Sequence, residues 1–439
     1  MKLTKRLLFI TCTLLVLSLI VAPQVLSLLG FPSHFKIIKG IDQSLEISFP
    51  FDVYISCDEP GQLIVNGQAI DGDSLKVNLS EPLNFQSKSL GQVDVNFKLF
   101  GLIPIRRMEV KVVPEVKVYP GGHSIGVLLH ADGVMVVENA YVEGEDGRRH
   151  YPARDAGIGP GDYLVEINGK KVLDKEDVGQ AIYQSSKKGQ PVQVKVRKAD
   201  GSIDETSIQP VKNKQGTYMI GLFIEDGVAG VGTLSFYEPV SGRYGGLGHV
   251  IAEANTRRPI QIRSGEIVNA NISGINSGQR GLPGEKLGTF LGGEDAMGKI
   301  DKNCDYGIYG KLNKIPRNPF FKEPIPVATS QQVEEGRASI YTVVNGNKIE
   351  KYTIEIERVY HQNRPATRGL IIKIVDPKLL QKTGGIIQGM SGSPIVQNGR
   401  LVGAVTHVFV NDPKKGYGVL AEWMIQKAGI GRKKYKKAN

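Results

Sequence analysis

Gly389-Met390-Ser391-Gly392-Ser393-Pro394 places a serine inside a turn that is rich in glycine. A serine hydroxyl is a weak nucleophile at neutral pH, so it needs a nearby base and hydrogen-bond donors for the oxyanion that it creates. Glycines let the backbone bend sharply, which can aim the N–H groups of Gly389 and Ser391 at one point in space. We therefore predict that Ser391 is a nucleophile and that these two N–H groups hold the oxyanion. An ordinary Gly/Ser turn between two strands is the alternative.

The pattern Gly-x-Ser-Gly-x-Pro resembles the nucleophile turn of chymotrypsin-like peptidases, with Met390 at a position where many of them carry Asp. The residues that follow fit such a site. Residues 395–396 and 401–405 are apolar and strand-like, and Asn398-Gly399 between them favours a hairpin turn with positive φ. The sequence thus predicts a strand, a tight turn and a second strand directly after the nucleophile.

The general base has to come from one of seven histidines. His249 lies in a turn of small residues, 244–250, that enters an apolar strand, which is a suitable setting for a catalytic imidazole. His361 ends an alternating strand and is interpreted as a surface residue. His407 ends the strand after the nucleophile hairpin and is interpreted as a pocket-wall or strand-end residue. We therefore predict that His249 is the base.

The third catalytic residue should be a carboxylate that holds the imidazole tautomer and stabilises its charged form. Spacing alone does not choose among the candidates between base and nucleophile, which include Asp295, Asp301, Asp305 and Asp376. Asp376 follows the apolar run 369–375 and precedes Pro377. This position fits a strand end near the nucleophile, and it fits the N-cap of a helix equally well.

Three segments together resemble the stage IV sporulation protein B (SpoIVB) peptidases of spore-forming Firmicutes: residues 229–239, 244–250 and 388–395. The first contains a Gly-Thr-x-x-Phe-Tyr-x-Pro run and the second a Gly-His-Val turn. The resemblance covers most of the chain and implies an N-terminal membrane segment, a PDZ domain and then a serine peptidase domain. It also implies that the catalytic residues are His249, Asp376 and Ser391.

The resemblance implies a function as well. SpoIVB-like peptidases are exported serine endopeptidases that cleave themselves and a membrane-bound regulatory protein, in the space between the forespore and mother-cell membranes. The second cleavage frees an intramembrane protease, which activates a late sigma factor. The residues leave two other functions open: a PDZ-based signalling scaffold with an inactive peptidase domain, and a general envelope quality-control protease.

The N-terminus predicts export. Lys2, Lys5 and Arg6 precede an apolar run, residues 7–29, which is long enough to span a bilayer with the positive charges inside. We interpret residues 1–30 as a membrane anchor, and a cleaved signal peptide is the alternative. The three cysteines do not suggest a disulfide framework.

Length and composition favour a mainly β protein with several domains, because the 439 residues include 53 glycines and 41% hydrophobic residues. Residues 35–112 are predicted to form a small β domain, and residues 226–430 a chymotrypsin-like pair of β-barrels. The net charge of +11 is partly local to a basic tail, residues 431–439, which suits either anionic lipid or solvent. The chain has no His-Glu-x-x-His zinc helix and no nucleic-acid motif, so we expect no catalytic metal, no cofactor and no nucleic-acid partner.

Residues 113–212 are predicted to form a PDZ domain. Residues 161–169 are read as a glycine turn and a strand that ends in Asn-Gly, which resembles bacterial PDZ domains. PDZ domains bind an extended chain end as an added strand, with loop N–H groups on the terminal carboxylate. The loop that enters a strand at residues 122–127 predicts this binding loop, formed by Ser124, Ile125, Gly126 and Val127. Its ligand would be a segment of this chain or of a partner, and a PDZ domain that serves only in packing is the alternative.

Overall fold

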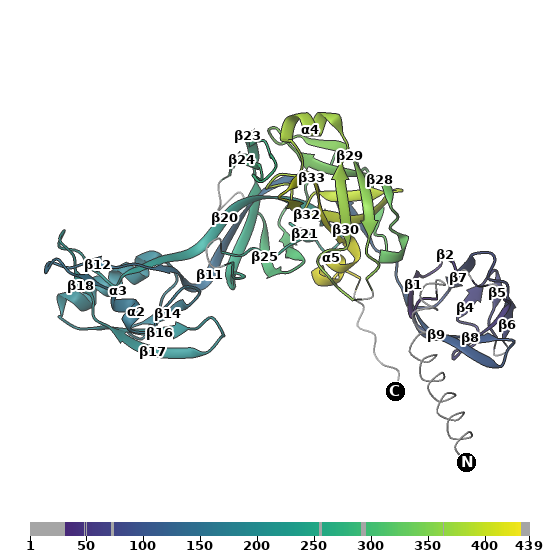
Figure 1. Ribbon diagram of the computed structural model, residues 1–439, viewed down its shortest axis with the longest axis horizontal. Coiled ribbons are helices and arrows are strands. Elements are labelled where there is room, and N and C mark those ends of the chain that lie inside the picture. Colours follow the sequence, from purple (N-terminus) through teal and green to yellow (C-terminus); the bar gives the residue numbers. More distant parts are fainter. Residues whose placement is uncertain are drawn as a thin grey trace, which may run out of the picture. The chain divides into compact units, whose positions relative to one another are not determined.

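The computed structural model describes residues 31–431, apart from residues 48, 50, 72–73, 254–256, 291–295 and 363. The predicted membrane segment, residues 1–30, and the basic tail from residue 432 onward lie outside the described residues. Strands dominate the fold, as the sequence predicted (Figure 1). No helix among the described residues is long and apolar enough to cross a membrane. The chain divides into two compact units, residues 1–116 and 117–439.

The first unit contains two sheets. One has the strands β1 (His34–Ile38), β9 (Ile103–Val113), β8 (Gly91–Leu99), β3 (Val53–Cys57) and β6 (Leu75–Val77), in that order. The other has the strands β2 (Gln43–Leu45), β7 (Leu83–Ser87), β4 (Leu63–Val65) and β5 (Gln68–Ala69), in that order. Apolar residues alternate with more exposed ones along β8, so Val93, Val95 and Phe97 share one buried face.

The PDZ domain lies in the second unit and is built on helix α3 (Lys175–Lys187) and a sheet. Asp174 caps this helix, because its carboxylate accepts a hydrogen bond from the Asp177 N–H at 2.8 Å. The longer strands of the domain are β14 (Tyr163–Ile167), β16 (Val192–Arg197) and β17 (Ile203–Ile208). The short elements are β12 (Val142–Glu143), β13 (Arg149–His150), α2 (Pro152–Asp155), β15 (Lys170–Lys171), β18 (Val211–Lys212) and β19 (Tyr218–Met219). The helix and the sheet meet in a core that includes Val134, Leu164, Val178 and Val194.

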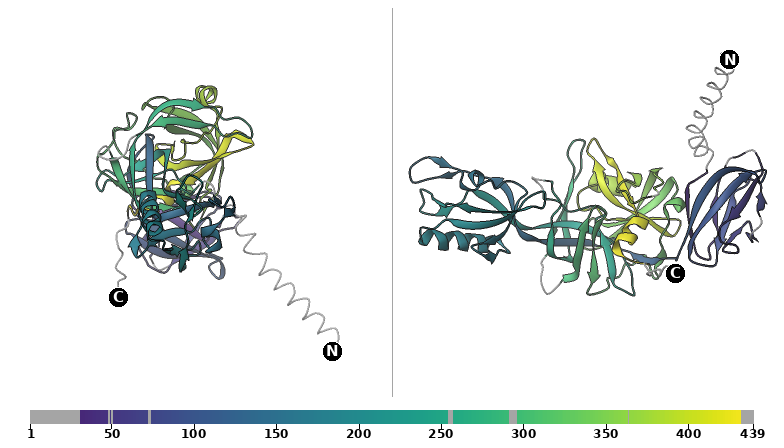
Figure 2. Two further views of the ribbon diagram at one scale, coloured as in Figure 1. Left: turned by 90° about the vertical axis from the view of Figure 1, so that its left-hand side faces the viewer. Right: turned by 90° about the horizontal axis from the view of Figure 1, so that it is seen from below.

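Two long antiparallel strands connect the PDZ domain to the rest of the second unit: β11 (Ser124–Asn139) and β20 (Leu222–Tyr237). Each has 16 residues, and they pair with each other along their length with irregularities after His130 and after Val136. Figures 1 and 2 show this ribbon running from the PDZ strands into the barrels. One strand pair therefore belongs to both folds.

The first barrel has six antiparallel strands in the order β11-β20-β21-β26-β25-β22, and β22 pairs with β11 to close it. The strands not yet given are β21 (Arg243–Gly246), β22 (Ile262–Asn269), β25 (Ala296–Cys304) and β26 (Gly307–Leu312). Beside β20 the sheet continues into β10 (Lys117–Pro120) and β27 (Ile325–Pro326). A hairpin of β23 (Asn271–Asn276) and β24 (Glu285–Thr289) stands between β22 and β25 in the sequence. The barrel core contains Ile125, Leu234, Tyr244, Ile267 and Ile308.

The second barrel is a closed sheet in the order β28-β29-β30-β33-β32-β31. Its strands are β28 (Gly336–Val343), β29 (Ile349–Val359), β30 (Leu370–Ile374), β31 (Pro394–Gln397), β32 (Arg400–Phe409) and β33 (Asp412–Leu420). The helical elements beside it are η1 (Ser330–Gln332), α4 (Pro377–Thr383) and α5 (Ala421–Ala428). Ile340, Ile354, Ile372, Ile395 and Val405 fill its core. The hairpin predicted at Asn398-Gly399 is confirmed, since both residues have positive φ and join β31 to β32.

The first barrel begins earlier in the chain than residue 226, the predicted start of the peptidase domain. The first half of β11 is a strand of the first barrel and residues 117–120 extend the same sheet, although the sequence predicted that residues 113–212 belong to the PDZ domain. The PDZ domain is thus inserted between the first and second strands of that barrel. The local pattern gave no sign of this, because β11 and β20 continue from one domain into the other without a turn.

Candidate active site

The nucleophile turn has the backbone that its glycines allow. Gly389 and Gly392 have φ of +88° and +93°, where a side chain would be strained. A Cβ at Gly392 would also lie 2.1 Å from the carbonyl oxygen of Thr233 in the first barrel. The Met390 side chain is fully buried in the second barrel, and Ser391 follows it with its Oγ donating a hydrogen bond to the Thr406 carbonyl at 2.6 Å. The two barrels therefore meet at this turn.

The N–H groups of Gly389 and Ser391 are oriented for an external acceptor. The Gln388 carbonyl accepts a hydrogen bond from the Lys286 N–H of β24 at 3.0 Å. In a trans peptide the next N–H points the opposite way, so that of Gly389 is turned away from β24. Within the described part of the chain, neither the Gly389 nor the Ser391 N–H donates to a protein acceptor. Two such donors are what an oxyanion requires.

Thr233, on β20 of the first barrel, joins the elements of the site. Its N–H donates to the Ser391 carbonyl at 3.0 Å, and its Oγ1 donates to the Gly389 carbonyl at 2.7 Å. Its own carbonyl accepts from the Leu247 N–H at 3.2 Å, at the turn that carries the histidine. We predicted no role for Thr233 from the sequence. The signal was present, because this residue is the Thr of the Gly-Thr-x-x-Phe-Tyr-x-Pro run.

His249 follows a strained turn in which Leu247 and Gly248 have φ of +65° and +74°. Its Nδ1 lies 2.9 Å from the Val250 carbonyl, which can only accept, so we assign the proton to Nδ1 and a free lone pair to Nε2. Burial lowers the pKa of His249, and the bond to Val250 opposes part of that shift. The imidazole is therefore neutral near pH 7, which is the state that a general base needs.

The nucleophile and the histidine turn both contact Thr406. Ser391 bonds the Thr406 carbonyl, while Gly248 is so close that a Cβ there would lie 2.9 Å from the Thr406 methyl group. Within the described residues the serine and imidazole side chains are not hydrogen-bonded to each other. Rotation about χ1 of Ser391 would break the bond to the Thr406 carbonyl and free the hydroxyl, and catalytic hydrogen bonds often tighten only when substrate binds.

A second imidazole stands beside the first. The rings of His249 and His407 have centroids 4.9 Å apart at an interplanar angle of 43°. Although part of His407 reaches solvent, desolvation lowers its pKa to about 4, with the charges of His249 and Arg368 acting in the same direction. Neither ring therefore carries a positive charge near neutral pH. The sequence favoured a pocket-wall or strand-end position for His407 and did not predict its contact with the base.

Asp376 does not lie at the imidazole in this structure, contrary to the assignment that the resemblance implied. One carboxylate oxygen accepts from the Lys378 and Leu379 N–H groups, at 3.0 and 3.2 Å, and the other from the Thr353 N–H at 3.1 Å. Asp376 is therefore the N-cap of α4. Tyr417 pairs with His407 on one side and with Ile371 on the other. Asp376 is five residues beyond Ile371, which is about 16 Å from Ile371 at strand spacing and leads away from the two imidazoles.

The other candidate carboxylates are placed differently. Asp295 lies outside the described residues, and Asp301 is exposed on β25. Asp305 is exposed in the turn between β25 and β26. The end of β25 touches the histidine loop, because the Asn303 side chain accepts from the Ile251 N–H at 2.8 Å. Within the described part of the chain, no carboxylate bonds to His249, and the Val250 carbonyl orients its ring.

The predicted PDZ binding loop is also placed elsewhere. Ser124, Ile125, Gly126 and Val127 pair with β20 on one side, and from Ile125 onward with β22 on the other. Ser124, Ile125 and Val127 are buried in the wall of the first barrel. A strand that is paired on both edges cannot accept a third, so these residues do not present a peptide site.

An open strand edge occurs at the other end of β20. Residues 222–225 pair with β11 alone within the described residues, and α3 contacts this part of the domain. Large side chains are exposed there, among them Met219, Phe223 and Tyr183 of α3. Gly221 has φ of +76°, and a Cβ would lie 2.5 Å from the Ala140 carbonyl. This edge is suited to adding a strand, and sequence analysis missed it.

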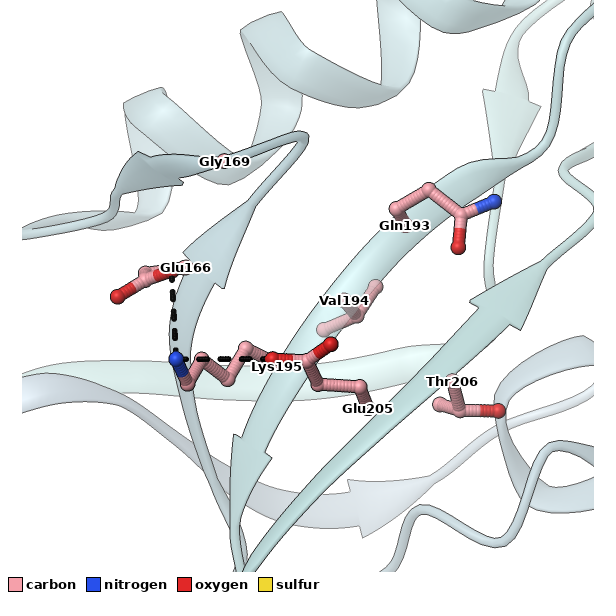
Figure 3. A pocket seen from close by; sticks show the side chains of 7 residues that line it. All are labelled: Glu166, Gly169, Gln193, Val194, Lys195, Glu205 and Thr206. Atoms are coloured by element: carbon pink, nitrogen blue, oxygen red, sulfur yellow. Dashed lines mark ion pairs between the residues drawn. The ribbon is translucent and has the colours of Figure 1, made fainter.

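A separate pocket of about 130 Å³ lies on the PDZ sheet (Figure 3). Lys195 stands in it between two carboxylates, 3.8 Å from Glu166 and 3.6 Å from Glu205. The charged groups of this pocket thus pair with one another, and we assign no ligand to it.

The two six-stranded barrels have the same strand order. One supplies a serine in a glycine turn and the other a neutral imidazole, and together they define a serine peptidase with an inserted PDZ domain. Residues 216–425 match the SpoIVB peptidase S55 family and residues 125–209 match the PDZ domain. The chain is a SpoIVB-family PDZ serine peptidase, which confirms the resemblance.

Two solved structures are similar to part of the chain. The Rv3671c protease from M. tuberculosis in its active form is 16% identical, with a TM-score of 0.26, over 46% of this chain and 75% of that one. The inactive form of Rv3671c protease is 14% identical, with a TM-score of 0.25, over 45% of this chain and 84% of that one.

Proposed function

We propose that this serine peptidase is an exported, membrane-anchored endopeptidase of sporulation signalling. It cleaves itself and then a membrane-bound regulatory protein, in the space between the forespore and mother-cell membranes. That cleavage frees an intramembrane protease and leads to activation of a late sigma factor. The family match supports this function, as does the apolar run at residues 7–29.

The observation that carries the catalytic part is the joint position of Ser391, His249 and two unbonded N–H groups. In the proposed chymotrypsin-like mechanism, His249 Nε2 takes the Ser391 proton while Oγ attacks the peptide carbonyl. The N–H groups of Gly389 and Ser391 hold the oxyanion. The imidazolium then gives its proton to the leaving amine, and water releases the acyl-enzyme by the same route.

The open edge of β20 supports a role for the PDZ domain in presenting substrate. An extended segment of this chain or of its partner adds to residues 222–225 as a further strand. The same strand continues to Thr233, which holds the nucleophile turn. Peptide capture and catalysis are thus served by two ends of one strand.

The first test compares the full chain as wild type and as Ser391→Ala, with Ser393→Ala as the control for the neighbouring hydroxyl. Ser393 Oγ is buried and donates to the Met390 carbonyl at 2.6 Å, so it is not free to attack. We expect self-cleavage and labelling by a fluorophosphonate in wild type and Ser393→Ala, and neither in Ser391→Ala. Equal labelling of all three proteins would contradict the assignment.

A second test separates signalling from quality control. A signalling enzyme cuts few proteins, whereas a quality-control enzyme degrades unfolded ones. We expect the wild-type chain to cut a membrane-bound regulator from a sporulating cell at one or a few sites and to leave denatured casein intact. Rapid digestion of casein would favour the quality-control function. If neither the regulator nor casein is cleaved and no fluorophosphonate labelling occurs, the inactive scaffold is favoured.

A further inference from the structure

Four large apolar side chains are exposed at one end of the first unit. Phe51, Phe100, Leu102 and Ile103 have exposed fractions of 52%, 63%, 84% and 57%. We call them the tip patch, because Phe100 and Leu102 belong to the turn between β8 and β9 and Ile103 begins β9. Scattered exposed apolar residues are normal, but a contiguous group of large ones marks a contact surface.

The backbone of this turn is unusual for its sequence. Phe100 and Gly101 both have positive φ, +53° and +77°, and the Leu102 N–H donates to the Leu99 carbonyl at 3.1 Å. These are the features of a type I′ turn, whose first central position favours Asn over any apolar residue. An aromatic residue held at positive φ and pointing into solvent is costly to folding, which directs attention to a function for its side chain.

The chain enters the domain at the same end. The ring of Phe31 lies 5.4 Å from that of Phe97 and 5.5 Å from that of Phe49, and Phe49 in turn lies 5.7 Å from Phe51 of the tip patch. Phe97 precedes Phe100 by three residues, about 10 Å along the strand. The tip patch therefore extends beyond the point where the chain enters.

The sequence before that point is the apolar run 7–29, which ends two residues before Phe31. Two residues span at most about 7 Å even when extended. If this run crosses a bilayer, as in the proposed function on which this inference rests, Phe31 is held near the membrane surface. The tip patch, at the same end of the domain, is then within reach of the lipids.

The charges around the tip patch also suit a phospholipid surface. Lys98 and Arg106 lie on the two strands just behind the turn. The carboxylate of Asp52, next to Phe51, is neutralised by Lys76 at 2.8 Å. Basic residues behind inserted apolar ones are attracted to anionic head groups.

We propose that the tip patch inserts into the interface of the bilayer that holds the N-terminal segment. The occupant of this surface is the phospholipid membrane itself. Contact at a second point, besides the anchor, fixes the orientation of the first unit on the membrane.

The test uses the full chain in vesicles of phosphatidylcholine and phosphatidylglycerol, with one cysteine at a time carrying an environment-sensitive NBD label. Leu102→Cys reports on the tip patch, in a background where Cys12, Cys57 and Cys304 are serine. Lys88→Cys is the matched control, because it is exposed near the other end of β8. Cys12 retained alone reports on the apolar run. Fluorophosphonate labelling confirms that each protein is folded.

We expect label at 102 to be blue-shifted and quenched several-fold more by spin-labelled lipid than label at 88. Quenching at 12 without quenching at 102 would overturn the tip proposal and leave the anchor intact. No lipid quenching at 12 would remove the membrane anchor from the proposed function and the tip proposal with it. Label at 102 that is shielded from aqueous iodide but not quenched by lipid would indicate a protein partner or a second copy, and would also overturn the proposal.

A substitution in the turn guards against misfolding as an explanation. Phe100→Asn suits positive φ better than phenylalanine does, so it should raise the melting temperature. We expect it at the same time to reduce lipid quenching at 102 several-fold. A fall in both the melting temperature and the lipid quenching at 102, or no change in that quenching, would contradict insertion.

Discussion

The two barrels of this peptidase share a strand order and differ in what is inserted into them. In each barrel the strands, counted in chain order, follow one another around the wall as first, second, third, sixth, fifth and fourth. The second barrel closes most of its strands with short turns, whereas the first carries the PDZ domain after its first strand and the β23–β24 hairpin after its fourth. Both insertions leave the ladder of the first barrel intact. Thr233 of β20 and Lys286 of β24 both bond to the nucleophile turn. The first barrel and its hairpin therefore also shape a site whose serine lies in the second barrel.

The sharpest test of this division removes the imidazole of each barrel in turn. His249→Ala should lower kcat by about 10⁵-fold or more, as loss of the base does in serine peptidases. His407→Ala should retain most of the activity, since His407 touches the base and not the serine in this structure. Rates of peptide cleavage measure both. Equal losses would mean that the second barrel supplies the base as well.

A smaller effect is expected at the link between the barrels. Thr233→Val keeps the shape of the side chain but removes the hydrogen bond to the Gly389 carbonyl. We expect kcat to fall about 10- to 100-fold with little change in KM, because a misplaced oxyanion donor acts mainly on the transition state. Thr233→Ser restores the hydroxyl and should recover most of the rate. A change confined to KM would place Thr233 in substrate binding instead.

The pH profile gives a subtler comparison of the two imidazoles. Burial lowers the pKa of His249, and the His407 ring covers part of it. His249 works as a base only when neutral, so a lowered pKa extends activity toward acid. His407→Ala admits water and should raise the pKa of His249, which moves the acid limb of kcat/KM to higher pH. An unchanged or lower limb would show that His407 does not shield the base.

The smallest expected effect concerns Asp376. Asparagine caps helices as well as aspartate does, so Asp376→Asn should leave stability and kcat nearly unchanged. Asp376→Ala should cost about 1 kcal/mol of unfolding free energy, measured in urea, through loss of the cap. A fall of about 10⁴-fold in kcat of folded Asp376→Asn would instead indicate a triad carboxylate and a rearranged active form.

Sequence reasoning succeeded where chemistry is local. The glycines around Ser391 and the Asn398-Gly399 hairpin dictate their own backbone, and the structure has both with positive φ as expected. It failed where the answer depends on which strands pair. Ser124 to Val127 were read as a loop, yet they are held between two strands more than 90 residues further on. Asp376 fitted two roles locally, and only tertiary placement separates them.

The paired strands β11 and β20 make the PDZ domain an exchangeable cassette. His130 and Gly227 face each other in the ladder, so both ends of the inserted domain leave the barrel about 5 Å apart. A two-residue hairpin turn can replace everything between them and retain all six barrel strands. Removal of residues 113–212, by contrast, takes the whole of β11 from the barrel, together with β10 beside it. Truncations cut at those sequence limits would unfold the peptidase and be mistaken for evidence that catalysis needs the PDZ domain.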